Sequence, residues 1–192
     1  KKESPKKTSS AKAVLPSKPK KESEKDKKKT AVNTVSENQS LVDPSEKQAD
    51  VIICKHSLTL SNLPKIYWPK EKISKGDMIN YYYQAAEYIM PYLKDRPQSL
   101  NRYPNGIAGE SFYQKNIGDQ VPGWLETYQY KSASDGKIKR YLLAKDEASL
   151  IYMANLGCIE MHPWHSRKQK PDNPDWCVID IDPDKTNTFK QV

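Results

Sequence analysis

Two periods of apolar and polar positions run along the chain, and together they predict a mixture of helices and strands. Ser74 with Asp77 three residues later has the pattern of a capping box. The apolar positions that follow recur at helical spacing: Met78, Ile79, Tyr82, Ala85, Ala86, Ile89 and Met90. Asp95, Arg96 and Pro97 are predicted to end this helix. A second helix is predicted to open at Asp146 and to stop at Gly157.

Shorter segments alternate as strands do, between clusters of turn-forming residues. They are 57–60, 98–103, 111–115, a hairpin of 128–131 with 137–143, and 158–162. The segment between the first of these strands and Ser74 contains Pro64 and Pro69 and is predicted to be a loop. Residues 176–182 have the strongest strand pattern in the chain. We therefore expect an α+β sheet domain without internal repeats.

Residues 1–50 differ from the rest in composition. They hold 13 Lys and 8 acidic residues, no aromatic residue and no Gly. Such a segment buries too little apolar area to offset the entropy of ordering it, so it is predicted to be a disordered Lys-rich linker. Order is expected to begin near Val51, which gives a domain of residues 51–192. The linker lysines contribute most of the net charge of +8 and are suited to weak contacts with DNA phosphates.

The remaining composition excludes several protein classes. No run of about 18 apolar residues is present, which argues against a transmembrane helix and a membrane partner. Cys54, Cys158 and Cys177 lack the paired spacing of a zinc site, and their odd number does not suit a disulfide framework. Reduced thiols in a cytoplasmic protein are expected.

Asp180 and Asp182 form the first candidate site. In a strand they would point to one face while Ile179 and Ile181 are buried on the other. Two neighbouring carboxylates repel each other unless a cation lies between them, and a divalent metal supplies one. Such a pair suits phosphoryl transfer in a polymerase, a phosphatase or a nuclease. An isolated D-x-D motif, however, is more often an exposed strand end.

Basic and aromatic residues form a second candidate site on strands 98–103 and 111–115. Arg102 and Lys115 are suited to phosphate contacts. Phe112 and Tyr113 are adjacent in a strand, so one ring is expected in the core while the other can stack on a base. Core filling by both rings is the alternative.

His162 ends strand 158–162, and a neutral imidazole there is suited to a nucleotide phosphate or sugar. His165 follows three residues later, so zinc is a weaker alternative for this pair.

Asn62, Lys65 and Lys75 lie before and at the start of the first helix. Helix N-termini attract phosphate, so these side chains together with free backbone N–H groups predict a pocket for a terminal phosphate. The alternative is that both lysines are ordinary surface residues.

In order, these segments resemble the polymerase domain of bacterial DNA ligase D, a member of the archaeo-eukaryotic primase superfamily. The resemblance covers about residues 56–192. Its motifs are residues 60–69 (LSNLPKIYWP), 74–77 (SKGD), 95–97 (DRP), 102–107 (RYPNGI), 112–115 (FYQK), 154–157 (ANLG), 160–164 (EMHPW) and 180–183 (DIDP).

The resemblance implies a primase-like fold and a DNA-repair nucleotidyltransferase of non-homologous end joining. It would add dNTPs or rNTPs in a template-directed reaction with Mn²⁺ or Mg²⁺, within a multidomain ATP-dependent ligase. Its expected partners are double-strand ends, gapped DNA with a 5′-phosphate and the Ku end-binding protein, in the bacterial cytoplasm at the nucleoid. The family's third metal carboxylate is expected beyond Val192, so the domain is expected to be incomplete and inactive alone. The alternative is a non-catalytic module that binds DNA ends.

Position by position, the resemblance also implies roles for the candidate residues. Asp180 and Asp182 would bind metal and, with His162, carry catalysis. Arg102, Lys115 and His162 would bind the nucleotide. Asn62, Lys65 and Lys75 would bind the 5′-phosphate, and Phe112 and Tyr113 would contact the template.

Overall fold

The computed structural model of the chain describes residues 40–118, 121–131, 136–181, 188 and 190. The described residues belong to one compact unit. It starts ahead of Val51, at which the sequence predicted order to begin. Backbone amides of Leu41 and Val42 donate to Asn80 Oδ1 over 2.9 and 3.0 Å, and the Val42 side chain is buried. These contacts tie the start of the unit to the first helix.

The main sheet has five strands in the described part of the chain, and all pair antiparallel. One edge of the central strand β5 (Pro97–Arg102) pairs with β6 (Phe112–Gln114) and β8 (Ile138–Leu143), and β8 pairs with β7 (Thr127–Lys131). The opposite edge of β5 pairs with β9 (Cys158–Pro163). These five strands confirm the strands predicted in this region.

Three helices are present among the described residues: α1 (Lys75–Gln84), α2 (Ala86–Leu93) and α3 (Glu147–Asn155). The capping box of Ser74 and Asp77 is confirmed, as is the start of α3 at its N-cap Asp146. The first helix, predicted as one, is interrupted at Ala85. The apolar spacing continues across this break, with Met78 and Ile79 of α1 and Ala86 and Leu93 of α2 all buried, so the periodicity did not reveal it.

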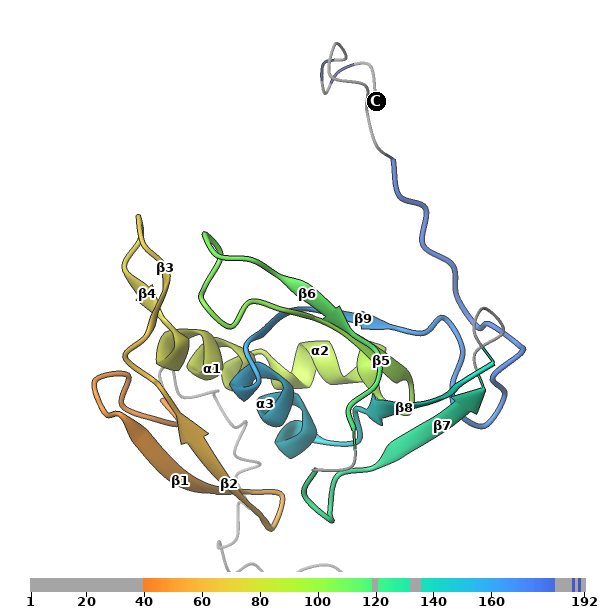
Figure 1. Cartoon of the computed structure of the whole chain (residues 1–192), viewed down its shortest axis with the longest axis horizontal. Coiled ribbons are helices and arrows are strands. Elements are labelled where there is room, and N and C mark those ends of the chain that lie inside the picture. Colours follow the sequence, from red (N-terminus) through yellow and green to blue (C-terminus); the bar gives the residue numbers. More distant parts are fainter. Residues whose placement is uncertain (1–39, 119–120, 132–135, 182–187, 189, 191–192) are drawn as a thin grey trace, which may run out of the picture. The chain divides into compact units, whose positions relative to one another are not determined.

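The helices lie together against one face of the sheet (Figure 1). Leu100 of β5 and Leu142 of β8 pack in one buried cluster with Leu150 and Met153 of α3. A second cluster joins α1 and α3 to a hairpin of β1 (Gln48–Ile53) and β2 (His56–Ser61). The opposite face of β5 is therefore left for polar side chains.

The segment predicted to be a loop after β2 contains a short hairpin, β3 (Ile66–Trp68) with β4 (Ile73–Ser74). Strands of three and two residues are too short to show a period, so the sequence pattern missed them.

No helix in the described part of the chain is both long and apolar enough to cross a bilayer.

The strand predicted over residues 176–182 is wrong for its described part, 176–181. This segment leaves the sheet as an extended tube (Figure 1), and Val178, Ile179 and Ile181 are 61%, 83% and 62% exposed. An apolar segment forms a strand only where a neighbour pairs with its backbone, and no described strand does so here. Asp182 lies outside the described residues.

Candidate functional site

Lys75 is a buried cation at the first position of α1. Its exposed fraction is 5%, which excludes the alternative of a surface lysine. Its Nζ donates to the Ser61 carbonyl oxygen over 2.8 Å and to Asn155 Oδ1 over 2.9 Å. Because the capping box fixes where α1 starts, it also fixes Lys75 between the end of β2 and the end of α3.

The backbone N–H groups at the start of α1 are all used within the protein. The amides of Lys75 and Gly76 donate to the carbonyls of Lys65 and Leu63 over 2.8 and 2.9 Å, and that of Asp77 donates to Ser74 Oγ over 3.1 Å. The expected free N–H groups are therefore absent here, because the chain before α1 folds back over the helix end. Any anion at this position would be held by side chains.

Asn62 and Lys65 precede Lys75 in the sequence, and both of these residues are exposed. Lys65 Nζ donates to the Pro104 carbonyl oxygen over 2.6 Å and to Asn105 Oδ1 over 2.8 Å. Asn62 has a left-handed φ of 57° in the turn that leads to Lys65. The two hydrogen bonds of Lys65 join this turn to the segment that follows β5.

Arg102 belongs with these lysines. Its Nε donates to the Leu156 carbonyl oxygen over 2.7 Å and its Nη1 to Gln114 Oε1 over 2.8 Å, while its Cζ lies 5.2 Å from the centre of the Phe112 ring. Burial, together with the charges of Lys65 and Arg102, lowers the pKa of Lys75 to about 8. The three cations therefore lie close enough to affect one another.

The hydrogen-bond partners of these three cations, within the described residues, are all uncharged. They are the carbonyl oxygens of Ser61, Pro104 and Leu156 and the carboxamide oxygens of Asn105, Gln114 and Asn155. Clustered cations without a carboxylate attract an anion, and a phosphate fits their donors. We call Asn62, Lys65, Lys75 and Arg102 the basic pocket.

His162 lies on the opposite face of the sheet from Arg102. Residues of a strand alternate between faces, and Asn101 pairs with both Tyr113 and Glu160, whereas Arg102 pairs with Phe112. His162 Nε2 lies 3.3 Å from Glu160 Oε2, and its ring centre lies 5.4 Å from that of Tyr113. The structure thus separates two residues that were expected to bind the nucleotide together.

Glu160 lies beside His162 and was not among the candidate residues that the sequence predicted. Its carboxylate accepts hydrogen bonds from Tyr103 Oη over 2.7 Å and Asn101 Nδ2 over 3.1 Å, and these bonds, Tyr103 first, lower the pKa of Glu160. The signal was present, since Glu160 and His162 are two residues apart in a strand and so share a face. Zinc at His162 and His165 gains no support, because no group of three metal-binding side chains occurs in the described ranges.

The two aromatic residues of β6 are both exposed, Phe112 by 46% and Tyr113 by 59%. The expectation that one or both rings fill the core is wrong, because β6 is a strand of only three residues at the edge of the sheet. Lys115, one residue beyond this strand, is exposed as well.

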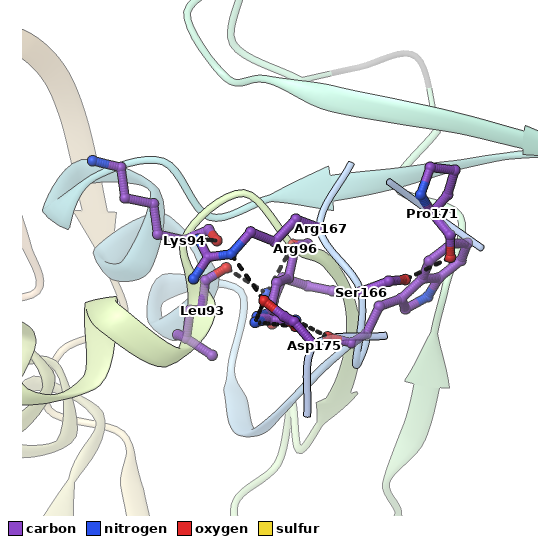
Figure 2. A network of polar contacts seen from close by, with 9 residues as sticks. Leu93, Lys94, Arg96, Ser166, Arg167, Pro171 and Asp175 are labelled. Carbon is purple, nitrogen blue, oxygen red and sulfur yellow. Dashed lines mark hydrogen bonds and ion pairs between the residues drawn. The ribbon is translucent and has the colours of Figure 1, made fainter. Parts of the chain in front are cut away.

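Asp180 lies at the end of the described segment, and it too is exposed. Its carboxylate is a hard oxygen ligand suited to Mn²⁺ or Mg²⁺. The segment is held at its base by the network in Figure 2, in which Arg96 and Arg167 both contact Asp175. Arg167 Nη1 also donates to the Lys94 carbonyl oxygen over 3.1 Å, which ties this loop to the end of α2.

Comparison with known proteins identifies the family. The model of the LigD primase-polymerase domain matches residues 74–192, which is more than half of the chain. The chain belongs to the LigD primase-polymerase family. The resemblance to the polymerase domain of DNA ligase D, read from its motifs, is confirmed.

The curated relatives of this LigD domain are longer proteins. The bifunctional non-homologous end joining protein LigD of Bacillus subtilis is 32% identical over 133 residues, which are 69% of this chain and 20% of that protein. The multifunctional LigD of Mycolicibacterium smegmatis is 27% identical over 137 residues, 69% of this chain and 18% of the relative. The chain thus spans about a fifth of their length.

A solved structure agrees with the family and with the fold. The polymerase domain from Mycobacterium tuberculosis ligase D in complex with DNA superposes with a TM-score of 0.55 at 26% identity, covering 57% of this chain and 38% of that one. The predicted α+β, primase-like fold is confirmed. The individual site residues stay predictions.

Proposed function

We propose that this LigD domain is part of a nucleotidyltransferase that repairs DNA breaks by non-homologous end joining. It adds dNTPs or rNTPs opposite a template, in a reaction that requires a divalent metal, within a multidomain ATP-dependent ligase. The observation that carries the proposal is the basic pocket, whose cations have only uncharged partners among the described residues. Support comes from the family and from a relative solved with DNA.

In this proposal the two faces of the sheet have different tasks. The basic pocket, beside α1 and α3, binds the 5′-phosphate of the DNA strand downstream of the break. The polar face with His162, together with Lys115, binds the incoming nucleotide, and Tyr113 stacks on the template. Asp180 and Asp182 hold Mn²⁺ or Mg²⁺, which would stabilise the attacking and leaving oxygens of the phosphoryl transfer. Arg102 is reassigned from the nucleotide to the phosphate, because it lies with Lys75 and away from His162.

Primer extension with the complete natural protein tests this function. The substrate is a gapped duplex with a labelled primer, a 5′-phosphate and added Mn²⁺. Asp180→Asn with Asp182→Asn is expected to abolish extension, because the substitutions remove the metal ligands. Asp172→Asn, an exposed carboxylate in the loop before Asp175, is the matched control. Extension by the double variant at the control's rate would disprove the metal role.

A non-catalytic module that binds DNA ends is the second candidate. The contacts that build the basic pocket involve no residue of the Asp180 segment, so end binding does not depend on that segment. Binding of phosphorylated ends without extension by the parent protein would favour this candidate. Shortening of the labelled strand would instead indicate a nuclease.

A further inference from the structure

Asn155, the last residue of α3, joins three parts of the basic pocket through one side chain. Its Oδ1 accepts from Lys75 Nζ over 2.9 Å and from the Ser61 backbone amide over 3.2 Å. Its Nδ2 donates to the Thr59 carbonyl oxygen over 3.0 Å. The carboxamide is therefore held by β2 at both ends, and its oxygen has one fixed direction toward the ammonium.

The chemistry of the carboxamide matters as much as its position. A buried ammonium usually pairs with a carboxylate, which cancels its charge. Here the ammonium of Lys75 has two uncharged oxygen partners, Ser61 O and Asn155 Oδ1, which satisfy two of its three N–H donors. The ammonium is held in place while its positive charge is retained.

The charged groups around Lys75 are also positive. Lys65, in the turn before β3, and Arg102, on β5, both act on Lys75. Tyr67 of β3 and Tyr152 of α3 face Arg102 in turn. None of these groups is a carboxylate, so an incoming dianionic phosphate is the species that would balance the cations.

We infer that Asn155 is a positioning residue, which fixes Lys75 as an uncompensated cation for the 5′-phosphate of a DNA end. This inference rests on the proposed function. It assigns a role to the ANLG motif at residues 154–157, for which the sequence alone indicated none. The required property at residue 155 is an uncharged oxygen in this place.

The substitution Asn155→Asp tests the inference, since it keeps the shape of the side chain and adds one negative charge. Binding of the complete natural protein is measured on two labelled gapped duplexes that differ only in a 5′-phosphate or a 5′-hydroxyl. The ratio of the two dissociation constants is the preference for phosphate. We expect Asn155→Asp to lower this preference by about tenfold, because the aspartate would take the place of the phosphate as the partner of Lys75.

The pH profile separates this role from a merely structural one. In the parent the pKa of Lys75 is about 8, so the phosphate preference is expected to fall as the pH rises through 8. An aspartate at residue 155 would stabilise the ammonium, and the remaining preference of the variant would then persist to higher pH. A fold defect would weaken binding of both duplexes equally and would leave the midpoint of the profile unchanged.

Three further variants make the result decisive. Asn155→Ser keeps an uncharged oxygen, although one bond nearer the backbone, and is expected to lose less of the preference than Asn155→Asp. Asn173→Asp adds the same charge on the exposed loop before Asp175 and is expected to match the parent. Equal loss in the Ser and Asp variants, or parent-like preference in Asn155→Asp, would overturn the role of Asn155. Absence of any preference in the parent and in Lys75→Met would instead overturn the pocket itself.

Discussion

Arg96 lies buried beneath Asp175, with its Nη2 2.7 Å from Oδ1 and 2.8 Å from Oδ2 of that carboxylate. The guanidinium also donates to the Trp164 carbonyl oxygen over 3.2 Å, and its Cζ lies 4.7 Å from the centre of the Trp176 ring. This pair joins the start of β5 to the last residues before the Asp180 segment. The segment that carries the candidate metal carboxylate is thus connected to the core at Asp175, which pairs with both Arg96 and Arg167.

Asp175→Asn is expected to destabilise the fold at neutral pH. The hydrogen bond from Arg96, followed by that from Arg167, lowers the pKa of Asp175 below its ordinary value of 3.8. A carboxylate whose pKa is lower in the folded state stabilises that state above its unfolded pKa, and the contribution is lost as the pH falls through the folded pKa. Urea unfolding of parent and variant should therefore differ at pH 7 and converge below pH 3.8.

Asp172→Asn, on the same loop and exposed, serves as the control and should follow the parent at every pH. If the gap between Asp175→Asn and the parent stayed constant down to acid pH, the ion pair would not be the source of the stability.

Features that depend on neighbouring residues were predictable from the sequence, and those that depend on distant residues were not. The capping box of Ser74 and Asp77 is local, and both its hydrogen bonds form as predicted. The burial of Lys75 depends on Ser61 and Asn155, which lie 14 and 80 residues away. Sequence spacing carries no information about such contacts.

The same limit explains the Asp180 segment. Val178, Ile179 and Ile181 have the composition of a buried strand, but burial needs a partner on each side, and the pattern cannot supply one. Helix α3 shows the opposite case. Its apolar residues Leu150, Ile151 and Met153 are fully buried, as the sequence pattern predicted, because this helix packs against the sheet.

Gly157→Ala is expected to destabilise the fold by more than the cost of its backbone conformation. Gly157 has φ of 79°, and an added Cβ would lie 2.7 Å from Tyr67 Oη. Gly118 has nearly the same φ, 77°, with nothing within 4 Å of such a Cβ, so Gly118→Ala measures the left-handed conformation alone, about 1 kcal/mol. Urea unfolding should give a clearly larger loss for Gly157→Ala. Equal losses would mean that Tyr67 moves away without cost.

Tyr113→Leu is expected to weaken binding to a template overhang without changing the melting temperature. Its ring is 59% exposed, so removing it costs little packing, whereas stacking of one base on an aromatic ring contributes about 1–3 kcal/mol. Fluorescence anisotropy with a labelled overhang measures the change. Tyr88→Leu, on α2 and 69% exposed, is the control and should bind as the parent does. A parallel loss in both variants would remove Tyr113 from the template site.

Lys75 is expected to make the fold less stable at neutral pH than at alkaline pH. Burial lowers its pKa from 10.5 to about 8, so the unfolded chain binds more protons between these values, and the free energy of unfolding rises with pH there. Between pH 7 and 10 the parent should gain on the order of 2 kcal/mol relative to Lys75→Met, which has no such proton. Urea unfolding of both proteins at the two pH values measures this difference, and the titration of other groups cancels in it. Lys170→Met, from the exposed surface, should show no such change. If the difference in unfolding free energy between parent and Lys75→Met did not vary with pH, burial would not disfavour the charged form of Lys75. Lys75 would then not be an uncompensated cation available to an anion.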